Sequence, residues 1–296
     1  MPREAGFVPV LLTVGVLCSV GSVQAQTTHI LRYDPSPPTR VNQISRSEIL
    51  MTVLPGAQDL ADTLAVEAFR LESTTQYVDA GDAGRYLVEL HYDSLRSRMR
   101  PVGGSWRELR ASEKETAVVR VLLDQQMRVL EAEFMDSPHL QASRSHMTRG
   151  LMGAARLTLP EEPIATGMPW STEVSYPLSP LRAVGQEEGV PADGELHSLA
   201  NAVLDSFVTR SGEILYYVTI SGSFVPAAFT STVGGQATMV SVRGSVAAMM
   251  IWSSTRNAFV SSATRAVVEM GVRDQGSPDS GSHVRFDVTT YTQVRM

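Results

Sequence analysis

The side chains that could bind a metal ion are few and widely spaced. The chain has six histidines, which are His29, His91, His139, His146, His197 and His283. No two of them have the His-x-x-x-His or His-Glu-x-x-His spacing that brings two imidazoles to one zinc ion. His139 and His146 lie seven residues apart, so on a helix they would share a face two turns apart, too far for one metal without other ligands. The sequence therefore predicts no metal site.

Motifs for covalent catalysis and cofactor binding are missing from the sequence too. There is no Gly-x-Ser-x-Gly elbow, no Walker loop and no Gly-x-Gly-x-x-Gly turn. Asp279-Ser280-Gly281-Ser282 resembles the signature of aspartic proteases, in which two carboxylates share a proton. A flexible loop precedes it here and no second copy occurs, so we expect a solvated turn. We therefore expect a protein that is not an enzyme and has no cofactor.

The charged residues point to one candidate anion site. Lys114 is the only lysine among 25 basic residues, and the rest are arginines. A codon bias explains this usage, and the functional alternative is that arginines were chosen for bidentate contacts to anions. That alternative needs a cluster, and Arg96, Arg98 and Arg100 would share one face of a strand. The acidic pairs Glu161-Glu162 and Glu187-Glu188 are expected to be solvated loop residues.

Apolar residues suggest a ligand cavity. Trp170 and Trp252 begin or end candidate strands, so they pack in a core or line an apolar pocket. The segment 247–252 has little polarity on either face, and we expect it to be covered on both sides. We predict a cavity in the concave face of a curved sheet. The candidate lining residues are Trp252, Met250, Phe224 and Tyr216.

Composition limits the class of protein. The 296 residues are 43% hydrophobic and 19% charged, with a formal net charge of −6. This composition is typical of a globular chain. It counts against a nucleic-acid partner, a cysteine-rich metal site and a polytopic helical membrane protein.

The first 25 residues read as a secretory signal peptide. Arg3 precedes an apolar run over 7–20, and small residues at Val23 and Ala25 suit a signal peptidase. Cleavage is predicted between Ala25 and Gln26, after the signal has transiently engaged the secretion machinery. The single cysteine, Cys18, would leave with the signal. We expect a mature chain that is soluble in the periplasm or outside the cell.

Period-two alternation of apolar residues dominates the mature chain and predicts about ten long antiparallel strands. The expected strands cover 29–33, 41–53, 61–74, 84–98, 170–176, 197–209, 213–225, 236–252, 258–273 and 282–296. The stretch 105–135 can be a hairpin around Asp124-Gln125-Gln126 or one long helix, and we favour the hairpin. Residues 177–194 are expected to form a loop.

One helix is expected at about 138–155, because Ser137-Pro138 suits an N-cap followed by proline. We predict a mainly β (α+β) fold, in which a large curved antiparallel sheet or half-barrel is covered by this helix. It forms a single domain over 26–296. An alternative divides it into halves, 26–136 and 165–296, joined by the helix and a Pro-rich link.

The segment 159–170 leads from this helix through Gly167 and Trp170 into further long strands. This pattern resembles exported, uncharacterised β-rich bacterial proteins with the half-barrel of the lipoprotein-carrier and LppX type. The resemblance implies an antiparallel sheet curved over helices, with an apolar cavity for acyl chains. It implies no role for any particular residue.

Three functions remain open from the sequence. The first is an exported, non-enzymatic protein that binds an apolar or lipid ligand in the concave face of its sheet. The second is a structural or interaction protein of the cell envelope, with an envelope protein as partner. The third is an outer-membrane β-barrel, although the 6% aromatic content is low for the aromatic girdles of such barrels.

Overall fold

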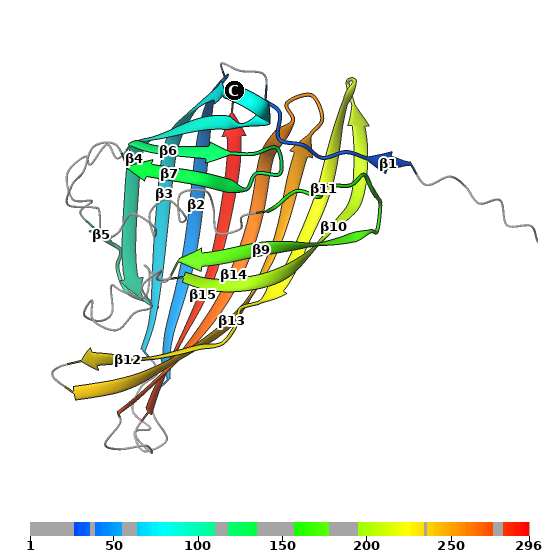
Figure 1. Cartoon of the computed structure of the whole chain (residues 1–296). Helices are drawn as coiled ribbons and strands as arrows, with labels where there is room; N and C mark the ends of the chain where they lie inside the picture. Colours follow the sequence, from blue (N-terminus) through cyan, green and yellow to red (C-terminus); the bar gives the residue numbers. More distant parts are fainter. Residues whose placement is uncertain are drawn as a thin grey trace, which may run out of the picture.

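The computed structural model describes residues 27–35, 39–54, 64–109, 118–134, 157–177, 195–233, 236–274 and 281–295. These ranges are almost entirely β-structure, with one 3-10 turn, η1, at Asp82–Gly84. A small two-stranded sheet pairs β1 (Thr28–His29) with β8 (Ile164–Ala165). All other described strands belong to one 13-stranded antiparallel sheet (Figure 1).

The large sheet is built mostly from long strands. Its members are β2 (Thr39–Leu54), β3 (Leu64–Ala80), β4 (Tyr86–Pro101), β5 (Arg107–Leu109), β6 (Val118–Leu123), β7 (Val129–Phe134), β9 (Pro169–Pro177), β10 (Glu195–Arg210), β11 (Glu213–Ser223), β12 (Ala227–Val233), β13 (Gln236–Ser253), β14 (Ala258–Asp274) and β15 (Gly281–Arg295).

The order of strands is β7-β6-β4-β3-β2-β15-β14-β13-β11-β10-β9, with β5 added to β4 and β12 to β13. The pairing of β2 with β15 joins the strands of the two predicted halves in one sheet. β7 and β9 end the order without pairing to each other, so the sheet of the described residues is open rather than closed into a barrel.

The prediction of long antiparallel strands is confirmed. Each predicted strand after residue 40 corresponds to an observed one, with ends that differ by up to six residues, whereas the strand predicted at 29–33 is reduced to β1. The predicted hairpin is confirmed over 118–134, where β6 and β7 pair around the turn at Asp124. β12 was not predicted, although the two glycines that follow it are a typical hairpin signal.

One face of the sheet, which we call the core face, carries the hydrophobic core. Strand pairing aligns its apolar residues, for example Val218 with Met250 and Ala266 with Val288. Val218 is fully buried and Ala266 is 1% exposed. Because side chains alternate along a strand, the intervening residues of these strands point to the opposite face.

A strap, residues 27–35, covers part of the core face. The rings of His29 and Tyr216 lie 5.0 Å apart, and those of Tyr33 and Tyr86 lie 5.3 Å apart. The Tyr33 amide also donates to the Gln125 carbonyl at 2.8 Å. The strap therefore crosses from β11 to the β6–β7 turn.

A second cover is the link, residues 157–168, which contains the predicted Pro-rich segment. Leu157 and Leu159 are buried, and the Leu159 amide donates to the Gln126 carbonyl at 2.9 Å. The Gly167 amide donates to the Leu204 carbonyl at 2.8 Å.

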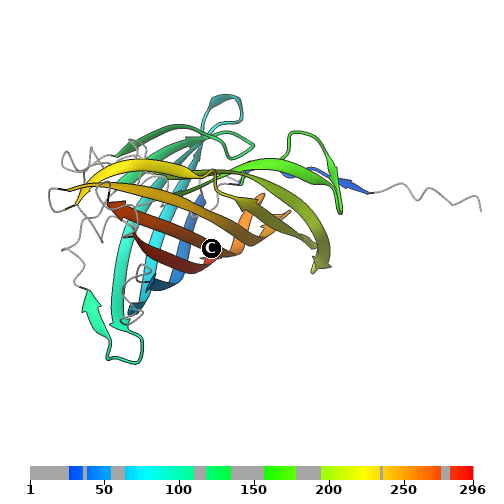
Figure 2. The same ribbon diagram turned by 90° about the horizontal axis from the view of Figure 1, so that it is seen from below.

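In the view from below, β6, β7 and β9 lie along the upper side of the long strands (Figure 2).

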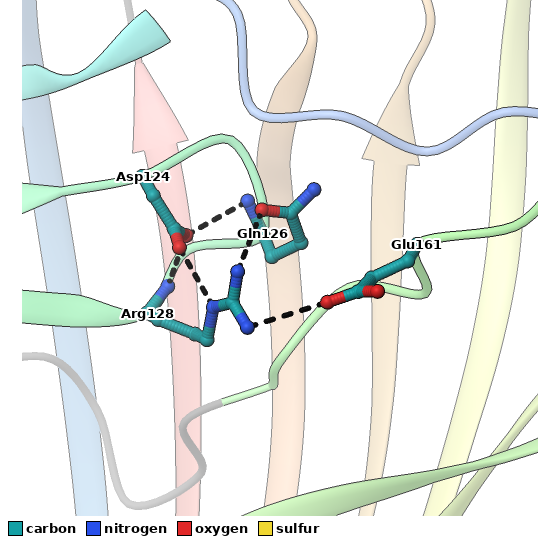
Figure 3. Close-up of polar contacts among 4 residues, drawn as sticks. All are labelled: Asp124, Gln126, Arg128 and Glu161. Atoms are coloured by element: carbon teal, nitrogen blue, oxygen red, sulfur yellow. Dashed lines mark hydrogen bonds and ion pairs between the residues drawn. The ribbon is translucent and has the colours of Figure 1, made fainter.

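Arg128 fastens the link to the β6–β7 turn (Figure 3). Its Nε donates to Asp124 at 2.7 Å, its Nη1 to Glu161 at 3.3 Å and its Nη2 to Gln126 at 3.2 Å. Glu161, which the sequence suggested was only solvated, therefore also has an ion-pair partner.

The described residues contain no α-helix, and residues 138–155, for which the covering helix was predicted, lie outside them. The predicted signal peptide at 1–25, the predicted cleavage site at Ala25 and Gln26, and residues 178–194 of the predicted loop also lie outside. In the part of the chain that is described, we find no helix with the length and hydrophobicity needed to cross a bilayer.

Candidate ligand-binding groove

The face opposite the core, which we call the groove face, is organised in cross-strand rows. Strand register places one residue of each long strand in the same row. The central row consists, from β4 to β13, of Arg98, Phe69, Glu48, Thr289, Arg265 and Ala247. The sheet thus brings residues from both ends of the chain into one line.

A groove of about 960 Å³ runs along this row and its two neighbours. It extends from Arg98 on β4 to Thr219 on β11. These strands are six spacings apart, roughly 29 Å along the sheet at about 4.8 Å each. Small-molecule sites have volumes of roughly 300–1,000 Å³, so the groove is large enough for an extended ligand.

The wall of the groove near β13 is mostly apolar or small. Ala247, Ala263 and Thr219 leave space above the backbone. Met249 is 45% exposed and Tyr291 is 51% exposed in the same row as Ala263. Folding leaves this apolar surface in water, which is typical of a binding site when the residues are contiguous.

Ion pairs occupy most of the charged groups on the groove face. Arg46 pairs with Glu48 along β2. Arg265 donates two hydrogen bonds to Asp287, at 2.9 and 2.5 Å. The bonds from Arg265, with its positive charge, hold the pKa of the Asp287 carboxyl below its ordinary value.

The predicted alignment of Arg96, Arg98 and Arg100 is confirmed, since they face Leu71, Phe69 and Glu67 along one face of β4. Arg100 donates to Glu67 at 2.5 Å.

The aromatic residues Trp106 and Phe69 close this end of the groove. The guanidinium carbon of Arg98 lies 4.6 Å from the Trp106 ring centre and 4.9 Å from that of Phe69. The guanidinium carbon of Arg100 also lies close to Trp106, 4.5 Å from its ring centre. These distances are in the range of cation–π interactions.

The four residues predicted from the sequence all lie on the core side. Tyr216 is paired with Trp252, and Met250 with Val218, so these side chains share one face. All four predicted residues are at most 8% exposed. Phe224 packs over Gly244, whose added Cβ would lie 3.1 Å from the Phe224 ring.

Of these four, Met250 lines a core-face cavity of about 140 Å³. Phe259 lines the same cavity and stacks against Trp252, with ring centres 4.8 Å apart. Polar side chains also line the cavity, and among them Gln76 donates a hydrogen bond to Gln43 at 2.6 Å. An apolar cavity of about 150 Å³ holds one benzene-sized molecule, so this cavity accommodates only a small group. Whether the four residues contact a ligand stays a prediction.

The expectation that 247–252 is covered on both faces is wrong. Ala247 and Met249 are exposed on the groove face, while Met250 and Trp252 are buried behind them. The lack of polarity on both faces of this segment was the signal that could have located the groove.

Within the described ranges, no group of three or more His, Cys, Asp or Glu side chains is arranged to hold a metal ion. His139 and His146 lie outside those ranges, as do Asp279 and Ser280 of the protease-like tetrapeptide.

No protein-family model matches the sequence, and no curated protein is significantly similar to it. A structure describing lipid–protein interactions in lipovitellin aligns with a TM-score of 0.49 and 11% identity, over 89% of this chain and 25% of that chain. An outer membrane channel from Pseudomonas putida F1 aligns with a TM-score of 0.24 and 8% identity, over 93% and 100%. The Pseudomonas aeruginosa protein OccK5 aligns with a TM-score of 0.24 and 5% identity, over 87% and 98%.

The chain thus spans about a quarter of the lipovitellin chain that it resembles. All three TM-scores are too low to identify a family or a function. The β-rich architecture implied by the resemblance to lipoprotein-carrier proteins is confirmed. Membership of that family is not shown.

Proposed function

We propose that the chain is an exported, non-enzymatic protein that binds an apolar or lipid-like ligand in the groove. The observation that carries this proposal is the groove itself, about 960 Å³ in volume and bordered by apolar side chains that folding leaves exposed. Leu50 and Met249, from strands far apart in the sequence, are 41% and 45% exposed along it. A ligand that covered them would gain roughly 25 cal/mol for each Å² of apolar surface removed from water.

In this proposal the main binding site is on the groove face, and the core face supports it. Its small cavity beside Met250 is several times smaller than the groove. The buried core residues on the other side of β13 keep the groove floor in place.

Filling the groove tests the proposal. Ala247→Phe adds a ring to the floor of the groove from an exposed position. We expect it to weaken binding of the neutral apolar dye N-phenyl-1-naphthylamine at least about 10-fold, measured by fluorescence titration of the purified chain. Ala228→Phe is the matched control, because Ala228 is exposed on β12 outside the groove.

Native mass spectrometry of the protein purified from cells gives an independent measurement, with a co-purified lipid as the expected result. Unchanged dye binding in Ala247→Phe would contradict the location of the site. Absence of dye binding together with absence of a co-purified lipid would contradict the function.

A second candidate is an interaction protein of the cell envelope. It is favoured by the open order of the sheet, because β9 is an end strand and the neighbouring β10 exposes Leu199 by 80% and Val208 by 49%. Unpaired sheet edges are sites where another chain can add a strand. A stable oligomer in light scattering, dissociated by Leu199→Glu, would favour this function over the first.

A further inference from the structure

Among the described residues, one arginine of the groove has no ion pair, whereas the other two do. Arg46 and Arg265 pair with Glu48 and Asp287. Arg98 instead faces Phe69 on β3. On its other side the register places Glu108 of β5 opposite Arg98, yet within the described part of the chain the two form no ion pair.

Two aromatic rings lie close to the guanidinium of Arg98. Its guanidinium carbon lies 4.9 Å from the ring centre of Phe69 and 4.6 Å from that of Trp106. Its Nε is buried and has no hydrogen-bond partner among the described residues. A buried donor without a partner is rare in folded proteins and requires an explanation, such as a ligand that supplies the acceptor.

The chemistry of this end of the groove favours an anion. Guanidinium groups bind carboxylates and phosphates through two parallel N–H bonds in the plane of the group. Arg96 and Arg100, on the same face of β4, add positive charge, which Glu67 and Glu108 offset in part.

The other end of the groove favours an apolar chain. Beyond the Arg265–Asp287 pair, the lining residues are uncharged up to Thr219 on β11. They include Ala263 and Met249, which stand in adjacent positions of one row.

We propose that the groove binds a single-chain amphiphile with an anionic head, of the fatty carboxylate or alkyl phosphate class. The head contacts Arg98 between Phe69 and Trp106, and the chain lies along the groove towards Met249. This assignment rests on the proposed function, since it names the ligand class of the same groove.

Isothermal titration of the purified chain with three twelve-carbon ligands tests the assignment. Dodecanoate, dodecyl phosphate and 1-dodecanol share a chain and differ in the head, and each is used below the concentration at which it aggregates. We expect the anion with the better-fitting head to bind about 10-fold to 100-fold more tightly than the alcohol, as a charged hydrogen bond in a shielded site would give. The tighter of the two anions identifies the head.

Variants at Arg98 assign the preference to this residue. Arg98→Gln should lower the affinity for both anions to about that of 1-dodecanol and leave 1-dodecanol binding unchanged. Arg98→Lys should retain part of the preference, because it keeps the charge and loses the planar fork. Arg243→Gln is the control, since Arg243 lies on the same face, pairs with Glu269 and does not line the groove.

Equal binding of all three ligands, or an anion preference that persists in Arg98→Gln, would overturn the assignment while leaving apolar binding in the groove intact. Failure of all three ligands to bind would overturn the assignment, and the proposed function would fail with it only if the dye did not bind and no lipid co-purified either.

Discussion

The two faces of the long sheet use similar residues for different purposes. Along β13, Met250 is 8% exposed on the core face, while Met249 beside it is 45% exposed on the groove face. Two tryptophans differ in the same sense, with Trp252 1% exposed and Trp106 37% exposed. Hydrophobicity alone therefore does not tell the faces apart.

The difference lies in what covers each face. On the core face the strap and the link place Tyr33 and Leu159 over the sheet. On the groove face, charged pairs such as Arg265–Asp287 surround apolar residues that remain partly open to water. The core face is thus covered, while apolar residues of the groove face stay partly open to water.

The largest expected effect compares the two tryptophans. Trp252→Ala removes a side chain that stacks on Phe259 and packs beside Tyr216, so we expect it to lower the free energy of unfolding by about 3–5 kcal/mol. Trp106→Ala removes a partly exposed ring and should cost about 1 kcal/mol or less. Equilibrium denaturation with urea measures both. Equal losses would show that the groove face also carries the fold.

The methionine pair sharpens the comparison at neighbouring positions. Met250→Ala leaves a cavity in the core and should cost about 2–4 kcal/mol. Met249→Ala changes an exposed side chain and should stay within about 0.5 kcal/mol, while weakening ligand binding. Denaturation and dye titration on the same two proteins separate stability from binding. The comparison fails if Met249→Ala is the more destabilising variant.

Strand positions could be predicted because alternation is a local property of the sequence. Tyr216, Val218 and Ile220 alternate with Tyr217 and Thr219, and β11 buries the first set. The same reasoning placed Arg96, Arg98 and Arg100 on one face, as observed.

The apolar segment 247–252 could have indicated one wall of the groove, but the rest of the groove could not be predicted because it depends on long-range register. Arg98 lies opposite Phe69 because β3 pairs with β4. The central row of the groove face extends to Ala247 only because β2 pairs with β15. No local pattern records these partners. The sequence indicated the core-face side chains as a ligand site, since hydrophobic residues look alike whether they fill a core or line a pocket.

A smaller effect is expected where the strap is held to the core face. Tyr86 donates to Asp34 at 2.5 Å, and Tyr86→Phe should cost about 1–2 kcal/mol of unfolding free energy. Burial, with the hydrogen bond to Asp34, raises the pKa of Tyr86 to about 12. Because the folded pKa lies above the ordinary value of about 10, this stabilisation is complete below about pH 10 and is lost as the pH rises through 12. Ultraviolet titration should show one late-titrating tyrosine fewer in Tyr86→Phe.

The smallest expected effect belongs to the groove face, at the Arg265–Asp287 pair. Arg265 lowers the pKa of Asp287, chiefly through its hydrogen bonds, so the pair stabilises the fold above the unfolded value of about 3.9 and loses this contribution as the pH falls through the lower folded pKa. The Arg265 side chain is 61% exposed, so solvent screens the pair and the effect is small. The difference in unfolding free energy between the natural chain and Asp287→Asn should therefore be slight near pH 7 and should shrink as the pH falls below the unfolded value of about 3.9. A difference as large as that for Met250→Ala would mean that the groove face is as important to stability as the core, and a difference that grew at acid pH would contradict the lowered pKa.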